Sequence, residues 1–171
     1  MENLNYIISE ATTSDAQNIL DYLKIVGGET DNLSFDSEGI TASLEEEIEI
    51  LEKYQKLKNG VFLLAKINNE IISCATAFQF LNNKKQTHVF KFAISVKKKF
   101  WGNKIANKMI DELLNLAKER GCTKMILYVN TANISAISLY LKKGFEIEGK
   151  LKNNIKSKDI YLDDYLMSKD L

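Results

Sequence analysis

The sequence predicts a single α+β domain over residues 1–171, with a mostly antiparallel central sheet of about seven strands and about four helices. Three observations predict it. Short apolar runs separated by tight polar turns occupy the middle of the chain and indicate an antiparallel meander. A strand, a long amphipathic helix and another strand follow in that order, which predicts one parallel pair. A chain of 171 residues that is 45% hydrophobic suits one core of ordinary size, and we find no repeat or linker.

The first elements are a short strand and a helix. Tyr6–Ile8 is a β-type run, and Ser14 and Gln17 have capping-box spacing at the start of the helix. Apolar residues then follow a 3.6-residue period, and we expect the pair Gly27-Gly28 to end the helix. The inward residues of this helix are Ala16, Ile19, Leu20, Leu23 and Val26.

A polar stretch and a second helix come next. Residues 29–40 are predicted to form a loop, and Ser43 with Glu46 gives a second capping-box pattern. The glutamates that follow are typical of a solvated face that also favours a helix N-terminus. The residues expected to face inward are Leu44, Ile48, Leu51 and Leu57.

The predicted meander has three strands and two turns. Val61–Ala65 is a continuous apolar strand, and Asn68-Asn69 supplies a tight turn into the strand Ile71–Phe80. Residues 82–85 form a second predicted turn before a strand over Thr87–Val96.

The second half of the chain changes character. Asn103–Glu119 is a long amphipathic helix that leads into the buried strand Met125–Val129, which should lie parallel to the strand before the helix. A short helix over 133–142 follows, and Phe145–Glu148 with Ile160–Met167 resembles a closing hairpin.

Composition excludes several classes of protein. The 23 basic and 23 acidic residues give zero net charge, and Arg120 is the single arginine, so nucleic-acid binding is not expected. Cys74 and Cys122 have no zinc or disulfide spacing, and we predict no metal and a buried Cys74 thiol. We recognise no signal peptide and no membrane-spanning run, and therefore expect a cytoplasmic protein.

Residues 96–106 are the first segment that could carry chemistry. They read as a strand end, a turn containing Gly102 and a helix start, where free N–H groups favour a phosphate. Four lysines in this segment add positive charge. A plain turn with solvated lysines explains the segment equally well, and a nucleotide P-loop is disfavoured because no GK[ST] follows.

The second segment, residues 130–145, contains an N-cap candidate and a tyrosine close to the end of a short helix. Together the two segments resemble the GCN5-related N-acetyltransferase (GNAT) family, whose motifs are V-x-x-x-x-[RQ]-x-x-G-x-[GA] and N-x-x-A-x-x-x-Y-x-x-x-G-F. The second motif matches Asn133, Ala136, Tyr140, Gly144 and Phe145. The resemblance covers nearly the whole chain, from residues 8–12 to residues 161–167, and is greatest to the bacterial branch with small-amine, spermidine-type and ribosomal-protein N-acetyltransferases.

Two positions depart from the first motif. Trp101 stands where the family usually has Arg or Gln, and Lys104 stands where it usually has the second Gly. Because backbone N–H groups bind the phosphates, the loop tolerates both, provided that residue 104 does not need a positive φ.

The resemblance implies a GNAT fold in which two parallel strands splay apart and acetyl-CoA enters the gap. It implies that main-chain groups of Ile94, Ser95 and Val96 hold the pantetheine arm and the thioester carbonyl. Asn133 would bind the pantetheine, and Tyr140, whose ordinary pKa is about 10, would protonate the leaving thiolate. The pyrophosphate would lie on Trp101, Gly102, Asn103, Lys104, Ile105 and Ala106.

The general base and the acceptor site are less clearly marked. The strand over 87–96 has no carboxylate, so His88, an ordered water or bulk solvent could take the proton; a structural role for His88 is the commoner case. The family's acceptor loop would place Glu29, Thr30 and Asp31 at the acceptor, where carboxylates suit a cationic amine, although a solvated loop explains them as well.

The predicted function is therefore acetyl transfer from acetyl-CoA to a primary amine by direct attack in a ternary complex. The amine belongs to a small molecule or a protein N-terminus, and a homodimer is possible. The alternative is a non-catalytic acyl-CoA-binding or regulatory module on the same fold. Acidic residues gather over 29–52 and lysines over 97–104 and 142–158, so the cofactor's phosphates and a cationic acceptor would meet opposite charges.

Overall fold

The computed structural model describes residues 4–57, 59–80, 83–157 and 159–171 and has one seven-stranded sheet in the order β1-β2-β3-β4-β5-β7-β6. β4 and β5 are parallel, and the other neighbouring pairs are antiparallel, which confirms the predicted α+β class. The strands are β1 (Ile7–Glu10), β2 (Gly60–Ile67), β3 (Glu70–Gln79), β4 (Val89–Val96), β5 (Lys124–Asn130), β6 (Glu146–Ser157) and β7 (Ile160–Asp170). The α-helices are α1 (Ala16–Glu29), α2 (Leu44–Leu57), α3 (Ile105–Glu119) and α4 (Ile134–Lys142), and two short 3₁₀ helices are η1 (Thr13–Asp15) and η2 (Lys98–Phe100).

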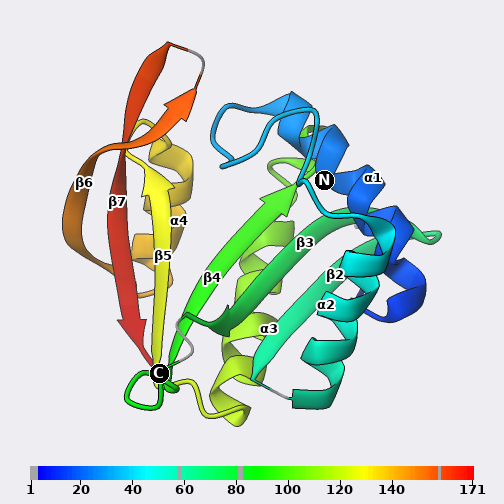
Figure 1. Ribbon diagram of the computed structural model, residues 1–171. Coiled ribbons are helices and arrows are strands. Elements are labelled where there is room, and N and C mark those ends of the chain that lie inside the picture. Colours follow the sequence, from blue (N-terminus) through cyan, green and yellow to red (C-terminus); the bar gives the residue numbers. More distant parts are fainter. Residues whose placement is uncertain (1–3, 58, 81–82, 158) are drawn as a thin grey trace.

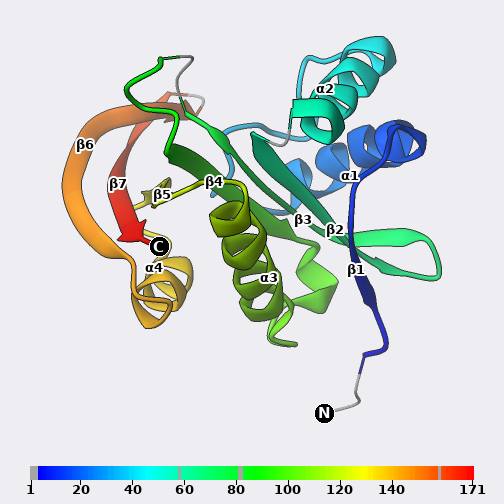
Figure 2. The same ribbon diagram turned by 90° about the horizontal axis from the view of Figure 1, so that it is seen from below.

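The helices cover both faces of the sheet. Figure 2 shows α1 and α2 on one face and α3 and α4 on the other. One buried cluster joins α3 and α4 to the sheet, with Phe90, Met109 and Phe145 almost fully buried. The other joins α1 and α2 to β2 and β3 through Ile19, Tyr22 and Leu51. We call these the α3–α4 face and the α1–α2 face.

The sheet opens between its two parallel strands. β4 and β5 are in register only from Val89 to Lys91, opposite Lys124 to Ile126. Beyond this point the two strands diverge, as Figure 1 shows, while β5 stays paired with β7 along its whole length. The divergence leaves the carboxyl-terminal half of β4 without a strand partner on one side.

Helix α1 differs from the sequence prediction at both ends. The capping interaction joins Thr12 and Asp15, because the Asp15 carboxylate accepts a hydrogen bond from the Thr12 N–H at 3.0 Å. The predicted pair of Ser14 and Gln17 is therefore wrong. Gly27 and Gly28 lie inside the helix, which continues to Glu29.

The glycine pair has a packing role. A Cβ on Gly27 would lie 1.9 Å from the Asp36 carbonyl oxygen, so the loop after α1 packs directly on the helix backbone there. Close approach of a second chain segment explains this glycine, and termination of the helix does not.

Other local predictions can be compared directly. Asn68 and Asn69 have φ of 46° and 68°, as a tight hairpin turn requires, and the capping box of Ser43 and Glu46 is present at α2. Of the second predicted turn, Asn82 lies outside the described residues. The strand expected from Thr87 begins at Val89, so His88 belongs to the preceding turn.

Within the described residues, no helix is both long and apolar enough to cross a membrane.

Candidate active site

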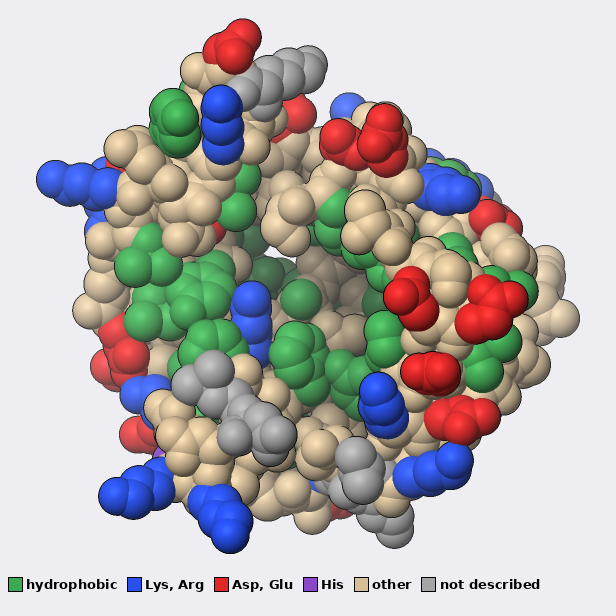
Figure 3. Space-filling model, viewed as in Figure 1, with side chains coloured by type: hydrophobic (Ala, Val, Ile, Leu, Met, Phe, Trp, Pro, Cys, Tyr) green, Lys and Arg blue, Asp and Glu red, His purple; other side chains and the backbone are tan. Residues whose placement is uncertain are grey.

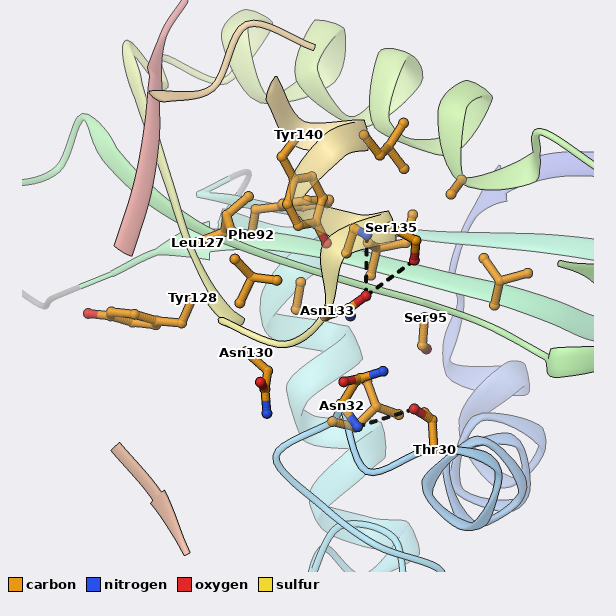
Figure 4. A pocket seen from close by; sticks show the side chains of 18 of the residues that line it. Thr30, Asn32, Phe92, Ser95, Leu127, Tyr128, Asn130, Asn133, Ser135 and Tyr140 are labelled. Carbon is orange, nitrogen blue, oxygen red and sulfur yellow. Dashed lines mark hydrogen bonds between the residues drawn. The ribbon is translucent and has the colours of Figure 1, made fainter. Parts of the chain in front are cut away.

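A cavity of about 930 Å³ occupies the opening between β4 and β5. Its lining comes from both faces of the sheet, and Figure 3 shows the hollow at the centre of the molecule. In the close view, Phe92 and Tyr140 lie on one side of the strands, whereas Thr30 and Asn32 lie on the other (Figure 4). The cavity therefore has two halves, which we name by their predicted roles: the cofactor half on the α3–α4 face and the acceptor half on the α1–α2 face.

The hydrogen-bond pattern decides which main-chain groups of β4 face the opening. Val89 and Lys97 bond to β3, through Phe80 N–H to Val89 O at 2.9 Å and Lys97 N–H to Ile72 O at 3.0 Å. Alternation along an antiparallel ladder then directs the odd-numbered residues to β3 and the even-numbered ones to β5. The main-chain groups of Ile94 and Val96 face the opening.

Ser95 differs from its two neighbours. Its carbonyl oxygen accepts a hydrogen bond from the Ser73 hydroxyl at 2.8 Å, on the β3 side. Its hydroxyl lies 3.0 Å from the Tyr22 hydroxyl, and Ser95 lines the cavity. The predicted main-chain role of Ser95 is therefore wrong, and only its side chain can take part.

Trp101 hydrogen-bonds to one of the main-chain groups of β4 that face the opening. Its indole N–H donates to the Val96 carbonyl oxygen at 2.7 Å. The Lys98 ammonium lies 6.0 Å from the centre of the indole ring, and half of the Trp101 surface is exposed at the cavity. The main-chain groups left open on β4 are therefore those of Ile94 and the Val96 N–H.

The turn before α3 presents a row of free donors. Among the described residues, the N–H groups from Gly102 to Asn107 have no protein acceptor. Gly102 has φ of 80° and Lys104 has φ of 60°, and such turns direct successive N–H groups toward one point. With the helix dipole of α3, this arrangement fits a diphosphate.

Two residues of this turn differ from expectation. Lys104 has a left-handed φ, so the condition under which the loop would tolerate a lysine there is not met, and the cost is roughly 1–2 kcal/mol for a residue with a Cβ. Asn103 is absent from the cavity lining, and its side-chain amide donates to the carbonyl oxygens of Phe100 at 3.1 Å and Trp101 at 3.2 Å. Trp101, Gly102, Lys104, Ile105 and Ala106 all line the cavity.

Asn133 caps helix α4, as predicted. Its side-chain oxygen accepts hydrogen bonds from the Ala136 N–H and the Ser135 hydroxyl, both at 3.2 Å. Figure 4 shows these two bonds at the edge of the cavity. The cap holds the start of α4 beside the opening and occupies the Asn133 oxygen, so the side-chain amide nitrogen is its remaining polar group.

Tyr140 lies under the opening and is 8% exposed. Its ring packs edge-on against Phe92 and is tilted against Phe145, each with centroids 5.9 Å apart. Burial raises the pKa of Tyr140 to about 12, so the hydroxyl stays protonated at neutral pH. In Figure 4 the hydroxyl end of the ring points toward the side of the cavity where Asn133 lies.

The predicted acceptor residues divide into two groups. Thr30 and Asp31 line the cavity, and the Thr30 hydroxyl accepts from the Asn32 N–H at 3.2 Å. Glu29 does not line it, because its carboxylate accepts a hydrogen bond from the Lys98 N–H at 2.7 Å. Glu29 thus connects the end of α1 to η2, which precedes the turn before α3.

His88 lies far from the opening. It is exposed in the turn before β4, at the opposite end of that strand from Val96, and is absent from the cavity lining. The prediction that it shares a strand face with Phe90 is wrong because it is not in the strand. No metal-binding group of His, Cys, Asp or Glu occurs within the described residues.

Four further lining residues were not predicted. Lys91, Tyr128, Asn130 and Asp164 line the acceptor half. No motif spacing marks them. Strand alternation together with the order of strands in the sheet would have placed them on one face.

A sheet that opens between two parallel strands beside a turn of free N–H groups defines the class of protein: this is a GNAT-type fold. The acetyltransferase (GNAT) family model matches residues 30–145. The GNAT-family acetyltransferase structure from Streptococcus pneumoniae is 30% identical, with a TM-score of 0.93 over 98% of this chain and all of that one. The ribosomal-protein-alanine N-acetyltransferase structure from Brucella melitensis is 24% identical, with a TM-score of 0.84 over 96% of this chain and 99% of that one.

Among curated proteins, N-acetyltransferase 8B of Rattus norvegicus is 26% identical over 105 residues, 60% of this chain and 46% of the relative. The chain thus spans about half the length of that relative. Because the family model covers more than half of the chain, the chain belongs to the GNAT acetyltransferase family.

Proposed function

We propose that this protein is an acetyl-CoA-dependent N-acetyltransferase that moves an acetyl group to a primary amine by direct attack in a ternary complex. The observation that carries the proposal is the cavity itself. It runs through the open sheet and joins free main-chain donors on one face to a polar half on the other. Structures from Salmonella typhimurium and Sinorhizobium meliloti with the same fold hold acetyl-CoA, which supports this choice of cofactor.

The cofactor half fits a long, flexible thioester with a diphosphate. The N–H groups of residues 102–107 would hold the diphosphate, and Lys104 would add a positive charge. The open main-chain groups of Ile94 would bind the pantetheine arm as an additional strand does, with the Asn133 amide beside it. The main-chain N–H of Ile94 or Val96, whichever lies nearer the thioester carbonyl, would stabilise charge on its oxygen.

Bound acetyl-CoA would supply an activated acetyl thioester and a thiol leaving group. Tyr140 would donate a hydrogen bond to the sulfur and then its proton, while a bond forms from nitrogen to the carbonyl carbon and the carbon–sulfur bond breaks. The raised pKa of Tyr140 makes it a weaker acid and keeps its proton in place until the thiolate leaves. The attacking amine would lose its proton to water, because β4 carries no carboxylate and His88 lies outside the lining.

A second candidate is a binding module that has kept the fold without the chemistry. Two observations favour it. No carboxylate lies on β4, and the Glu29 carboxylate already accepts a hydrogen bond from the Lys98 N–H. The bacterial branch, the homodimer and the cytoplasmic location stay predictions.

Thiol release from acetyl-CoA, measured with a panel of primary amines, separates the two candidates. An enzyme releases CoA only in the presence of an amine and yields the N-acetyl product by mass spectrometry. A binding module quenches or shifts the fluorescence of Trp101, the only tryptophan, when CoA is added, and releases no thiol with any amine.

A further inference from the structure

The acceptor half of the cavity contains two opposite charges on one face of the sheet. Side chains of Met125, Leu127 and Val129 belong to the α3–α4 cluster, so Ile126, Tyr128 and Asn130 point to the α1–α2 face. Residues paired in register share a face. Lys91 is paired with Ile126, and Asp164 is paired with Asn130, so both charged residues are on the α1–α2 face.

Asp164 is an incompletely neutralised carboxylate. It is 5% exposed, and its Oδ2 accepts one hydrogen bond from the Asn154 side-chain amide at 2.7 Å. Among the described residues it has no ion-pair partner, and its Oδ1 accepts no hydrogen bond yet is not sealed from solvent. Asp164 also lines the cavity. A buried carboxylate with a neutral partner is costly unless a cationic ligand completes it.

Lys91 is a cation without a counter-charge. Its ammonium lies 5.0 Å from the centre of the Tyr128 ring. In the described part of the chain no carboxylate forms an ion pair with it. Lys91 also lines the cavity, so it can bind an anionic group there.

We propose that the acceptor is a small zwitterionic amine of the α-amino-acid class, with its ammonium group on Asp164 and its carboxylate on Lys91. This inference rests on the proposed acetyl transfer and names its substrate class. Apart from Asp31 in the loop after α1, the remaining lining on this side is apolar or neutral and suits an uncharged side chain. It includes Leu33, Phe78, Ile155 and Leu162.

The two charges reach the cavity from strands on opposite sides of β5. The Lys91 ammonium lies over Tyr128, and Asp164 is level with Asn130, two residues or about 7 Å further along β5. The ammonium form binds Asp164, and the amine becomes reactive when one proton passes to water.

The same charges disfavour two other acceptor classes. A protein N-terminus carries an amide where the amino acid carries its carboxylate, so it leaves Lys91 without a counter-charge. A polyamine brings a second ammonium group toward Lys91, and like charges repel there. Selection therefore comes from Lys91 as much as from Asp164.

Four probes of similar size or charge test the proposal: L-leucine, L-leucinamide, 3-methylbutylamine and spermidine. For the wild-type protein we expect kcat/KM for leucine to exceed that for leucinamide by about 10-fold to 100-fold, the range for a charge-assisted hydrogen bond that loses its partner. Lys91→Gln should abolish this preference, and Asp164→Asn should raise KM for leucine and leucinamide alike.

Matched controls exist on the outer strands. The Lys156 ammonium lies 5.7 Å from the centre of the Tyr161 ring, as the Lys91 ammonium lies over Tyr128, but Lys156 does not line the cavity. Lys156→Gln should therefore leave the ratio of kcat/KM for leucine to that for leucinamide unchanged. Asp163→Asn removes the neighbouring carboxylate, which is also absent from the lining. Unchanged Trp101 fluorescence response to CoA in all four variants shows that the fold and cofactor half are intact.

Equal kcat/KM for leucine and leucinamide, or an unchanged ratio in Lys91→Gln, would overturn this inference while acetyl transfer itself stands. If no probe is acetylated, the proposed function fails instead. In that case calorimetric titration of leucine and leucinamide in the presence of CoA still tests the site, since Lys91→Gln must remove any preference in binding.

Discussion

The two halves of the cavity offer different kinds of groups to the ligands proposed for them. The cofactor half offers main-chain groups: open positions on β4 and the N–H groups of residues 102–107. The acceptor half offers side chains, among them Thr30, Lys91 and Asp164. The cofactor half comes from two continuous segments, whereas the acceptor half combines the loop after α1 with β4, β5 and β7.

This difference has a consequence for sequence change. Main-chain recognition depends on backbone shape, so Trp101 and Lys104 can replace the usual residues of the motif while the row of donors persists. Side-chain recognition depends on identity, so one substitution can change the acceptor. We therefore expect variants in the cofactor half to have graded effects on acetyl-CoA binding and variants in the acceptor half to alter selectivity.

The largest effect should come from the residue that serves the chemical step. Tyr140→Phe removes only the hydroxyl that would protonate the leaving thiolate, and general acid catalysis contributes about 10²-fold to 10⁴-fold. We expect kcat to fall by about that factor with the dissociation constant of acetyl-CoA unchanged, measured by steady-state kinetics and fluorescence titration.

Tyr165→Phe is the matched control, since Tyr165 is a partly buried tyrosine that packs on the same core outside the cavity. Because the pKa of Tyr140 is about 12, wild-type kcat should rise with pH as the acceptor loses its proton and should not decline below about pH 11. Equal turnover of Tyr140→Phe and the wild-type protein at every pH would refute the role.

The next largest effect is expected where the loop of the acceptor half packs on the backbone of α1. Gly27→Ala places a Cβ 1.9 Å from the Asp36 carbonyl oxygen and must displace the loop that lines the acceptor half. Overpacking costs about 1–3 kcal/mol, so we expect KM for the acceptor to rise about tenfold in kinetic assays, with acetyl-CoA binding retained.

Gly28→Ala is its control, because the nearest atom to the added Cβ is the Ser37 Cβ at 3.3 Å, and alanine favours a helix interior by about 1 kcal/mol. If both variants raise the acceptor KM equally, the loop contact at Gly27 is not what shapes this half.

A smaller effect tests the indole cap in the cofactor half. Trp101→Phe keeps an aromatic ring but loses the hydrogen bond to the Val96 carbonyl, worth about 1 kcal/mol. We expect KM for acetyl-CoA to rise about fivefold, with kcat for a saturating acceptor nearly unchanged. A change in kcat alone would show that Trp101 acts on the chemical step and not on the shape of the turn.

Lys104 separates backbone shape from charge in the same turn. Lys104→Gly relieves the left-handed φ and removes the charge, whereas Lys104→Gln removes the charge alone. An exposed charge near phosphates is worth up to about 1 kcal/mol, so both should bind acetyl-CoA about twofold to fivefold more weakly at low salt. Lys104→Gly should have the higher melting temperature; a lower one would mean that the turn is unstrained.

The smallest effect concerns the cysteines, which lie outside both halves. Burial raises the pKa of Cys122 to about 11, and it also raises the pKa of the Cys74 thiol. Neither thiol should react with a disulfide reagent in the folded protein, and Cys122→Ala should keep wild-type kcat, as direct transfer requires. Because the folded pKa of Cys122 exceeds the unfolded value, its contribution to stability is present below about pH 9 and is lost toward pH 11.

Much of the fold could be predicted from the sequence because its signals are local. Asparagines at the 68–69 turn, the Ser43–Glu46 cap and the amphipathic helix over α3 each act within a few residues. The errors arose where a distant segment changed the meaning of a local signal. Gly27 looked like a helix end because the loop that packs on it is invisible in the helix sequence.

The candidate site shows the same division. The segments over 101–106 and 133–140 could be predicted as cavity lining because each presents consecutive groups of one turn or helix. Glu29 and His88 could not be placed, since a hydrogen bond to Lys98 and a two-residue shift of the strand start decide their positions.

The sequence by itself therefore determined the α+β class and the family, and it predicted the proposed cofactor half, because periodicity, capping and short motifs are properties of contiguous residues. Only the tertiary structure decided the acceptor half. Lys91 and Asp164 are more than seventy positions apart in the chain, and they share one face only because β4 and β7 flank β5 in a sheet whose order the local sequence does not encode.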